Sequence, residues 1–241
     1  MRKYNYGSII LILIVNAIIY GILQNIADGD LSILSGIVAF IFDYIICRGL
    51  LYNREGSFSE YFRGIKTMTG KVFLMNILGV AINIILLTLA TLASGTGFFL
   101  YTDALNKPDG ITTFIVLFVL ITIFISLIFA YMNFFMADER YRDLTFFDSL
   151  KLIIKAGIKL FSESFMAGLR AYKITLLTGV IALVTAILSI KAPAAAILAI
   201  IFGLIAVISL FFCTPPFRAS LSDIYLDRSE EIYNEVIGNK N

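Results

Sequence analysis

The most distinctive reactive side chain in this sequence is a single acid within a long apolar run. Asp43 lies inside residues 31–50, and an ionisable group at membrane depth marks a candidate functional site. Arg48 lies about 140° further round the same helix, so it is poorly placed to pair with Asp43. The partner of Asp43 must then be an arginine from another helix, or water. The sequence leaves two interpretations of Asp43 open: a structural ion pair, or a proton or substrate site.

Amide side chains lie at a similar depth in other apolar runs. Asn76 and Asn83 are seven positions apart and therefore share one face of a helix. Amides at membrane depth either hydrogen-bond to neighbouring helices or line a polar cavity, and both interpretations stay open. Asn16 in the first apolar run raises the same alternatives.

The carboxylates after residue 136 alternate with cations. Asp138, Glu139 and Asp143 are interleaved with Arg140 and Arg142. Such a pattern is more typical of groups that neutralise one another at a surface than of a metal or acid–base site.

A second pair of acids, Asp223 and Asp227, lies one helical turn apart. Paired carboxylates catalyse acid–base chemistry only when a reacting group is held between them, so a solvated helix end explains this pair better. The sequence contains no His, and its two cysteines, Cys47 and Cys213, are too few for a structural zinc site. It also lacks the phosphate-binding and zinc-binding motifs. We therefore predict no catalytic residue, no metal and no cofactor.

These side chains must be positioned by membrane helices, because the composition excludes a soluble chain. Hydrophobic residues make up 59% and charged residues 15% of the 241 residues, and the mean hydropathy is +0.91. Soluble domains have about 45–50% and 25%. The sequence predicts an all-α membrane protein, a single integral membrane domain over residues 1–241. Its six expected spans are about 8–24, 31–50, 72–93, 111–136, 174–190 and 192–217.

The first and last spans carry local signals at their ends. Arg2 and Lys3 give the first span the basic start of a signal peptide, but no small-residue cleavage site follows, so we expect a retained helix. The short link Lys191–Pro193 predicts a tight hairpin between the last two spans. Pro215 and Pro216 cannot continue a helix and are expected to end the last span.

The distribution of positive charge predicts the orientation. All but Lys107 and Lys191 of the 19 lysines and arginines fall in segments on one side of the six spans. The loops on the other side contain four acids, Asp28, Asp30, Asp103 and Asp109. The positive-inside rule therefore places both termini in the cytoplasm.

Two of the cytoplasmic segments, 57–69 and 145–161, have apolar residues at helical spacing. Each begins with a capping pair, Ser57 with Glu60 and Thr145 with Asp148. The segments align at an offset of 88 with four identical pairs, which are Phe58/Phe146, Ile65/Ile153, Lys71/Lys159 and Phe73/Phe161. This predicts an internal duplication, although any cytoplasmic amphipathic segment would look similar.

The same two segments contain the candidate lipid-binding residues, which are Arg63, Lys66, Lys151, Lys155 and Lys159. An amphipathic helix in the membrane interface places its apolar face in the lipid and its cations against anionic head groups. The alternative is that both segments are short elbows docked on the ends of the spans.

The stretch 135–161 resembles a pattern in bacterial six-span proteins of the domain-of-unknown-function 975 type. The matching residues are Ala137, Asp138, Leu144, Thr145, Ser149, Leu150, Lys151, Lys155, Gly157, Lys159, Leu160 and Phe161, and more loosely Pro216, Phe217, Ala219, Ile224, Tyr225 and Leu226. Related groups are the membrane domain attached to some glycerophosphodiester phosphodiesterases and the YciC-like proteins. Residues 58–66 are also similar to the YesL-like family. The resemblance implies a bacterial cytoplasmic-membrane protein and supplies no catalytic residue.

Taken together, the residues predict a non-enzymatic membrane scaffold or accessory protein that interacts with anionic lipids, with another membrane protein or with itself, and not with nucleic acid. The alternative is a small transporter or permease subunit with a polar path at Asp43, Asn76 and Asn83. A membrane-embedded enzyme is disfavoured by the missing motifs.

Overall fold

The structure is a computed structural model that describes residues 2–26, 32–93, 119–189 and 192–238. Within these ranges the chain is helical and contains no strand. The all-α prediction is therefore confirmed for the described part of the chain. Part of the orientation argument depends on residues outside the described ranges, namely the four loop acids, Lys107 and Lys191. Residues 111–118 of the fourth expected span also lie outside these ranges.

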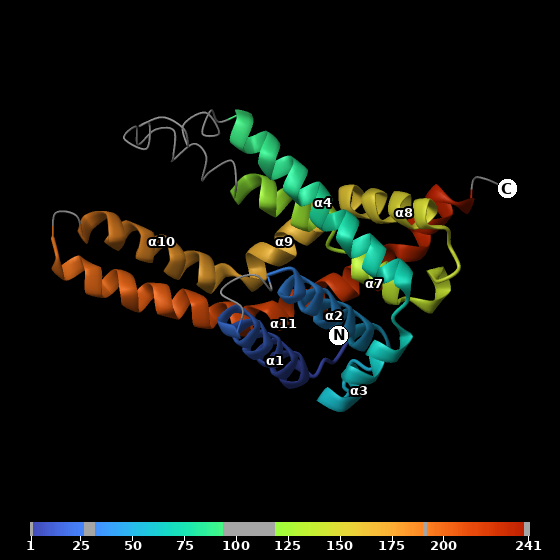
Figure 1. Ribbon diagram of the computed structural model, residues 1–241, viewed down its shortest axis with the longest axis horizontal. Coiled ribbons are helices and arrows are strands. Elements are labelled where there is room, and N and C mark those ends of the chain that lie inside the picture. Colours follow the sequence, from blue (N-terminus) through green and yellow to red (C-terminus); the bar gives the residue numbers. More distant parts are fainter. Residues whose placement is uncertain (1, 27–31, 94–118, 190–191, 239–241) are drawn as a thin grey trace.

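The N-terminal half consists of a helix pair and a bent segment (Figure 1). Helices α1 (Tyr6–Ile26) and α2 (Ser32–Tyr52) pack side by side, and a short helix α3 (Phe58–Arg63) with a 3-10 turn η1 (Gly64–Thr67) leads into α4 (Gly70–Ala93). The C-terminal half comprises a helix over 119–128, α7 (Met132–Ala137), η3 (Glu139–Tyr141), α8 (Phe146–Lys159), α9 (Phe161–Ala171), α10 (Lys173–Ser189) and α11 (Ala194–Val236).

Several helices are long and apolar enough to cross a membrane. By length and composition alone there are three among the described residues, Tyr6–Asn25, Val119–Ala137 and Ala194–Val236. The number rises to five if each bent pair forms one span: Phe58–Thr67 with Gly70–Leu86, bent by 95°, and Phe161–Ala171 with Lys173–Ser189, bent by 67°. The helix α2 coincides with the expected second span but is not among these five. The described residues therefore contain three to five candidate membrane spans, as expected of a multi-span helical membrane protein, and the number six stays a prediction.

The expectation that Pro215 and Pro216 end the last helix is wrong, because α11 continues through both prolines to Val236. Two prolines remove only two backbone donors, and neighbouring helices and hydroxyl side chains compensate for such losses. The hydroxyls of Thr214 and Ser220 donate to the carbonyls of Leu210 at 2.7 Å and Pro216 at 2.9 Å. These are not the two carbonyls, of Phe211 and Phe212, that the prolines leave without their helical donor. Beyond the prolines, α11 packs against α1, α2, α8 and α9, which stabilises the continued helix.

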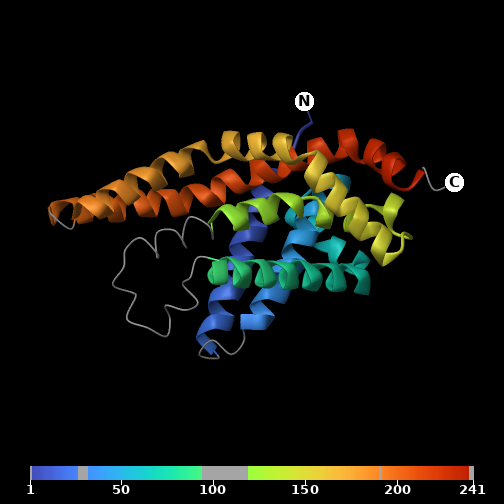
Figure 2. The ribbon, with the colours of Figure 1, turned by 90° about the horizontal axis from the view of Figure 1, so that it is seen from above.

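The helix α11 therefore has two different halves. Its 43 residues extend over about 65 Å, roughly twice the apolar thickness of a bilayer. The first half pairs with α10 in a hairpin that extends away from the other helices (Figures 1 and 2), and the outer faces of this hairpin expose large apolar side chains such as Leu177, Leu183, Ile197 and Ile200. The second half is polar on one side and buries Leu221, Tyr225 and Ile232 on the other.

The core lies where α2, α7 and the second half of α11 meet. Tyr225 of α11 is buried with its ring 5.5 Å from that of Phe134 and 4.8 Å from that of Phe135. At the other side of α2, Gly49 faces the Tyr61 ring so closely that a Cβ there would lie 2.1 Å from a ring carbon. The glycine thus allows α3 to close against α2.

The two amphipathic segments begin alike and then differ. The Ser57 amide donates to the Glu60 carboxylate at 2.6 Å, and the Asp148 amide donates to the Thr145 hydroxyl at 3.2 Å. The first segment then turns into α4, whereas the second continues as the 14-residue helix α8. The duplication stays a prediction.

The expectation that α8 presents its whole apolar face to lipid is only partly consistent with the structure. Leu152, Ile153 and Ala156 are buried inside the protein, while Phe147 and Ile158 remain exposed. The reason is a close helix crossing at Gly157, where a Cβ would lie 2.0 Å from the carbonyl oxygen of Ile128.

Candidate functional site

A chain of polar side chains links four helices at the level of Asp43. Asp43 of α2 forms an ion pair with Arg218 of α11, and it accepts a hydrogen bond of 2.5 Å from the Asn133 amide of α7. The Asn133 oxygen in turn accepts from Asn76 of α4 at 3.1 Å, and Asn76 also donates to its own helix, to the Val72 carbonyl. We call Asp43, Asn76, Asn133 and Arg218 the polar chain.

The polar chain is buried at one end and partly exposed at the other. The side chains of Asn76 and Asn133 are buried, whereas those of Asp43 and Arg218 are each 26% exposed. Each of the four side chains has a partner within the chain, so the arrangement fixes the four helices against one another. The structure thus brings the predicted site residues Asp43 and Asn76 together, while the side chain of Asn83 lies outside the described residues.

Two members of the polar chain were missed by sequence reasoning. Asn133 is an isolated amide near the end of an uncharged run, and no spacing signal connects it to Asp43. Arg218 follows Pro215 and Pro216, and because those prolines predict the end of the helix, the sequence does not place Arg218 beside α2. A continuous α11 is what brings Arg218 back to α2.

A second polar cluster surrounds Asp138, which is 3% exposed. Its carboxylate accepts hydrogen bonds from the Arg140 guanidinium at 2.7 Å, the Tyr225 hydroxyl at 2.9 Å and the Tyr52 hydroxyl at 3.2 Å. Alongside it, Arg48 donates to the carbonyl of Ala137 and pairs with Glu139 at 2.6 Å. Asp138 and Glu139 are therefore each paired with an arginine.

These hydrogen bonds determine the protonation of Asp138. Burial opposes the charge on the carboxylate, but the hydrogen bonds from Arg140 and Tyr225 outweigh it and hold the pKa of Asp138 below its usual range. Asp138 is thus a stable anion near neutral pH and is poorly suited to take up a proton in general base catalysis.

The other acid pair is occupied by the N-terminal segment. Arg2 pairs with Asp223 at 3.0 Å and with Asp227 at 2.6 Å, and the Tyr4 hydroxyl donates to Asp223 at 2.6 Å. The N-terminal segment therefore lies against the second half of α11.

The three candidate lysines of α8, Lys151, Lys155 and Lys159, differ in whether they contact a carboxylate. Lys155 pairs with Glu235 at 2.8 Å, and Lys159 pairs with Glu231 at 2.9 Å and with Glu235 at 2.7 Å. Donation to these two carboxylates raises the pKa of the Lys159 ammonium above its usual value. Steps of four residues advance about 40° round a helix, so the row turns progressively toward α11.

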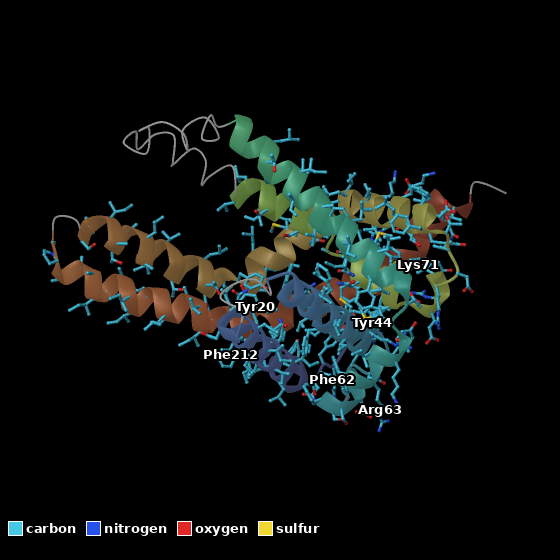
Figure 3. All side chains as sticks on the ribbon, viewed as in Figure 1. Tyr20, Tyr44, Phe62, Arg63, Lys71 and Phe212 are labelled. Carbon is cyan, nitrogen blue, oxygen red and sulfur yellow. The ribbon has the colours of Figure 1, made fainter. Side chains whose placement is uncertain are left out.

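The other three candidate cations, Lys151, Arg63 and Lys66, are exposed and form no ion pair among the described residues. Figure 3 shows Arg63 at the outer edge of the molecule, on α3. We call Arg63, Lys66 and Lys151 the basic face.

The described part of the chain offers little support for a metal site or a reactive thiol. No group of three or more acids and cysteines gathers there in a way that could hold a metal ion, and Cys47 and Cys213 are free and buried.

The aligned cations Lys71 and Lys159 of the two amphipathic segments have different roles. Lys71 donates to the backbone carbonyls of Arg142 and Leu144, whereas Lys159 pairs with glutamates of α11.

Comparison with known proteins adds no relative: no family model, no curated protein and no solved structure matches this chain.

Proposed function

We propose that this protein is a non-enzymatic accessory protein of the cytoplasmic membrane that binds anionic lipid through its basic face, with both termini in the cytoplasm. The observation that carries the proposal is a stripe on α8. Phe147, Lys151 and Ile158 lie within about 40° of one another round the helix. Phe147 is 71% and Ile158 60% exposed, and Lys151 is exposed between them.

Exposed apolar side chains on either side of an unpaired cation are typical of a helix lying in the membrane interface. The apolar groups enter the lipid, and the cation reaches the head groups at the same depth. The bent segment α3–η1 repeats the combination, because Ile65 is 40% exposed between exposed Arg63 and Lys66. Each such cation contributes roughly 1 kcal/mol of attraction to an anionic membrane surface.

The test compares two triple variants with the same loss of charge. One variant, Arg63→Gln/Lys66→Gln/Lys151→Gln, removes the basic face. The control, Lys155→Gln/Lys159→Gln/Arg228→Gln, removes three cations that the structure pairs with glutamates. Native mass spectrometry of gently purified protein measures the retained anionic lipid.

We expect the basic-face variant to lose retained phosphatidylglycerol, with affinity falling about fivefold for each cation. The control variant should keep its lipid and lose thermal stability instead. Equal lipid retention in wild type and the basic-face variant would contradict the proposal.

A small transporter or permease subunit is a second candidate, favoured by the partly exposed Asp43–Arg218 pair. Cys47 lies one turn beyond Asp43 and is 0% exposed, so it reports on opening of the helices there. A transporter that alternates access would expose Cys47 to a membrane-impermeant maleimide in a Cys213→Ser background. Full protection of Cys47 would exclude alternation at this site and leave the accessory role.

A further inference from the structure

An open groove of about 690 Å³ lies between α9 and α11, and its lining includes no residue of the basic face or the polar chain. One wall comes from α9 and the other from the part of α11 that begins at Pro216. Its lining residues are Ser162, Glu163, Met166, Ala167, Arg170, Ala171, Pro216, Ser220, Asp223 and Ile224. Small and apolar side chains alternate here with hydroxyls and charges.

The charges of this groove leave one cation unmatched. Asp223 is paired with Arg2, and Glu163 lies 3.4 Å from Arg228. Arg170 is exposed and forms no ion pair within the described ranges. A guanidinium in this state is suited to a phosphate, which it binds with two parallel N–H bonds.

The groove lies at the depth expected for lipid head groups. The apolar stretch of α10 begins at Ile174, immediately after Arg170 and Lys173, and α9 meets α10 at 67°. Tyr172 at this bend is 3.2 Å from the Thr214 hydroxyl, so the bend is level with the prolines of α11. Cations next to the end of an apolar span lie in the head-group layer.

The α11 wall offers an additional acceptor. Pro216 lines the groove and has no N–H, so the carbonyl of Phe212 lacks its usual donor in the helix. In lipid, an unsatisfied carbonyl costs free energy, and a hydroxyl or ammonium group of a head group would satisfy it.

We propose that the α9–α11 groove holds one phospholipid, with the Arg170 guanidinium on its phosphate and the apolar side chains Met166, Ala167 and Ile224 against the glycerol and the first part of the acyl chains. The inference deepens the proposed function, on which it rests for a lipid ligand, but it assigns a defined site for a single molecule. A free phosphate ion would gain nothing from the apolar wall, so the geometry favours the intact lipid.

The test is a lipid titration of the full-length protein in detergent, followed by native mass spectrometry with dimyristoyl phosphatidylglycerol. Arg170→Gln should weaken binding of the first lipid about tenfold. Arg170→Lys should restore part of the affinity. Lys173→Gln is the matched control, because Lys173 is also an exposed cation at the same depth but does not line the groove, and it should bind as wild type does.

Two further measurements separate the groove from a general charge effect. Ala167→Trp fills the groove without changing charge and should also abolish tight binding of the first lipid, with an unchanged melting temperature as the check on folding. Dimyristoyl glycerol, which lacks the phosphate, should bind wild type as weakly as the phospholipid binds the Arg170→Gln variant.

Equal losses in Arg170→Gln and Lys173→Gln, or wild-type binding by a folded Ala167→Trp, would overturn the inference. Displacement of the lipid by inorganic phosphate would overturn it too and indicate a free-anion site. If the basic-face variant loses lipid and Arg170→Gln does not, the proposed function stands and the groove fails. The reverse result would leave the groove and remove the basic face.

Discussion

Single residues of the polar chain are expected to have large effects, because each substitution removes one half of a pair. Asp43→Asn leaves the Arg218 guanidinium without its counter-charge. Breaking a fully buried pair costs about 3–5 kcal/mol, and partial exposure of both groups reduces the expected cost to roughly 1–3 kcal/mol. Thermal unfolding in detergent measures it.

The matching control for Asp43→Asn is the double variant Asp43→Asn/Arg218→Gln, which removes both charges. It should be more stable than Asp43→Asn alone, because no unpaired charge remains. If the two substitutions simply add, Asp43 and Arg218 are not coupled and the polar chain is not the element that fixes α2 to α11.

Asp138 gives a prediction for pH at the same scale. Because its pKa is lowered in the folded protein, its contribution to stability is present above the ordinary aspartate pKa of about 3.9 and is lost as the pH falls through the lowered value. Asp138→Asn should therefore destabilise the protein by roughly 1–3 kcal/mol at pH 7. The difference from wild type should shrink below about pH 4.

Unfolding curves between pH 3 and pH 7 test this, with Glu55→Gln as the control, since Glu55 is exposed. A destabilisation by Asp138→Asn that stays constant over the whole range would show that the carboxylate charge is not what its partners stabilise.

At the scale of elements, the crossing of α8 over the helix at 119–128 depends on the absence of a side chain at Gly157. Gly157→Val places atoms where the Ile128 backbone lies, so the helices must separate. We expect a loss of about 1–3 kcal/mol or more, or no folded protein at all. Gly179→Ala on α10 is the control, because a Cβ there has no neighbour within 4 Å and should be neutral or slightly stabilising.

The elements also show what sequence patterns can and cannot predict. Apolar runs predicted α1, α2 and α10 well, because a helix that crosses a membrane requires a long, predominantly apolar stretch. The prediction that Pro215 and Pro216 end the last helix was wrong, because that rule ignores the packing of the second half of α11. The cap at Thr145 was predictable from local spacing, whereas the partners of Asp43 and Lys159 depend on contacts between distant segments, which no spacing reveals.

At the scale of the whole molecule, packing and exposure are unevenly distributed. The buried aromatic core and nearly all ion pairs lie around α2, α7 and the second half of α11, while the α10–α11 hairpin packs mainly on its own two helices and exposes many large apolar side chains. Thr175 and Ser209 hydroxyls, 2.6 Å apart, join the two hairpin helices. Lipid must therefore supply most of the surroundings of the hairpin, whereas the polar end is organised by protein contacts alone.

The concentration of partners in α11 also bears on biosynthesis. Arg2, Asp43, Asp138, Lys155 and Lys159 are all made before the residues of α11 that they bind. Until residue 218 has been made, Asp43 lacks the arginine that it pairs with in the folded protein, so the polar chain closes only after that part of α11 is complete. Premature termination before residue 218 would leave Asp43 without its counter-ion.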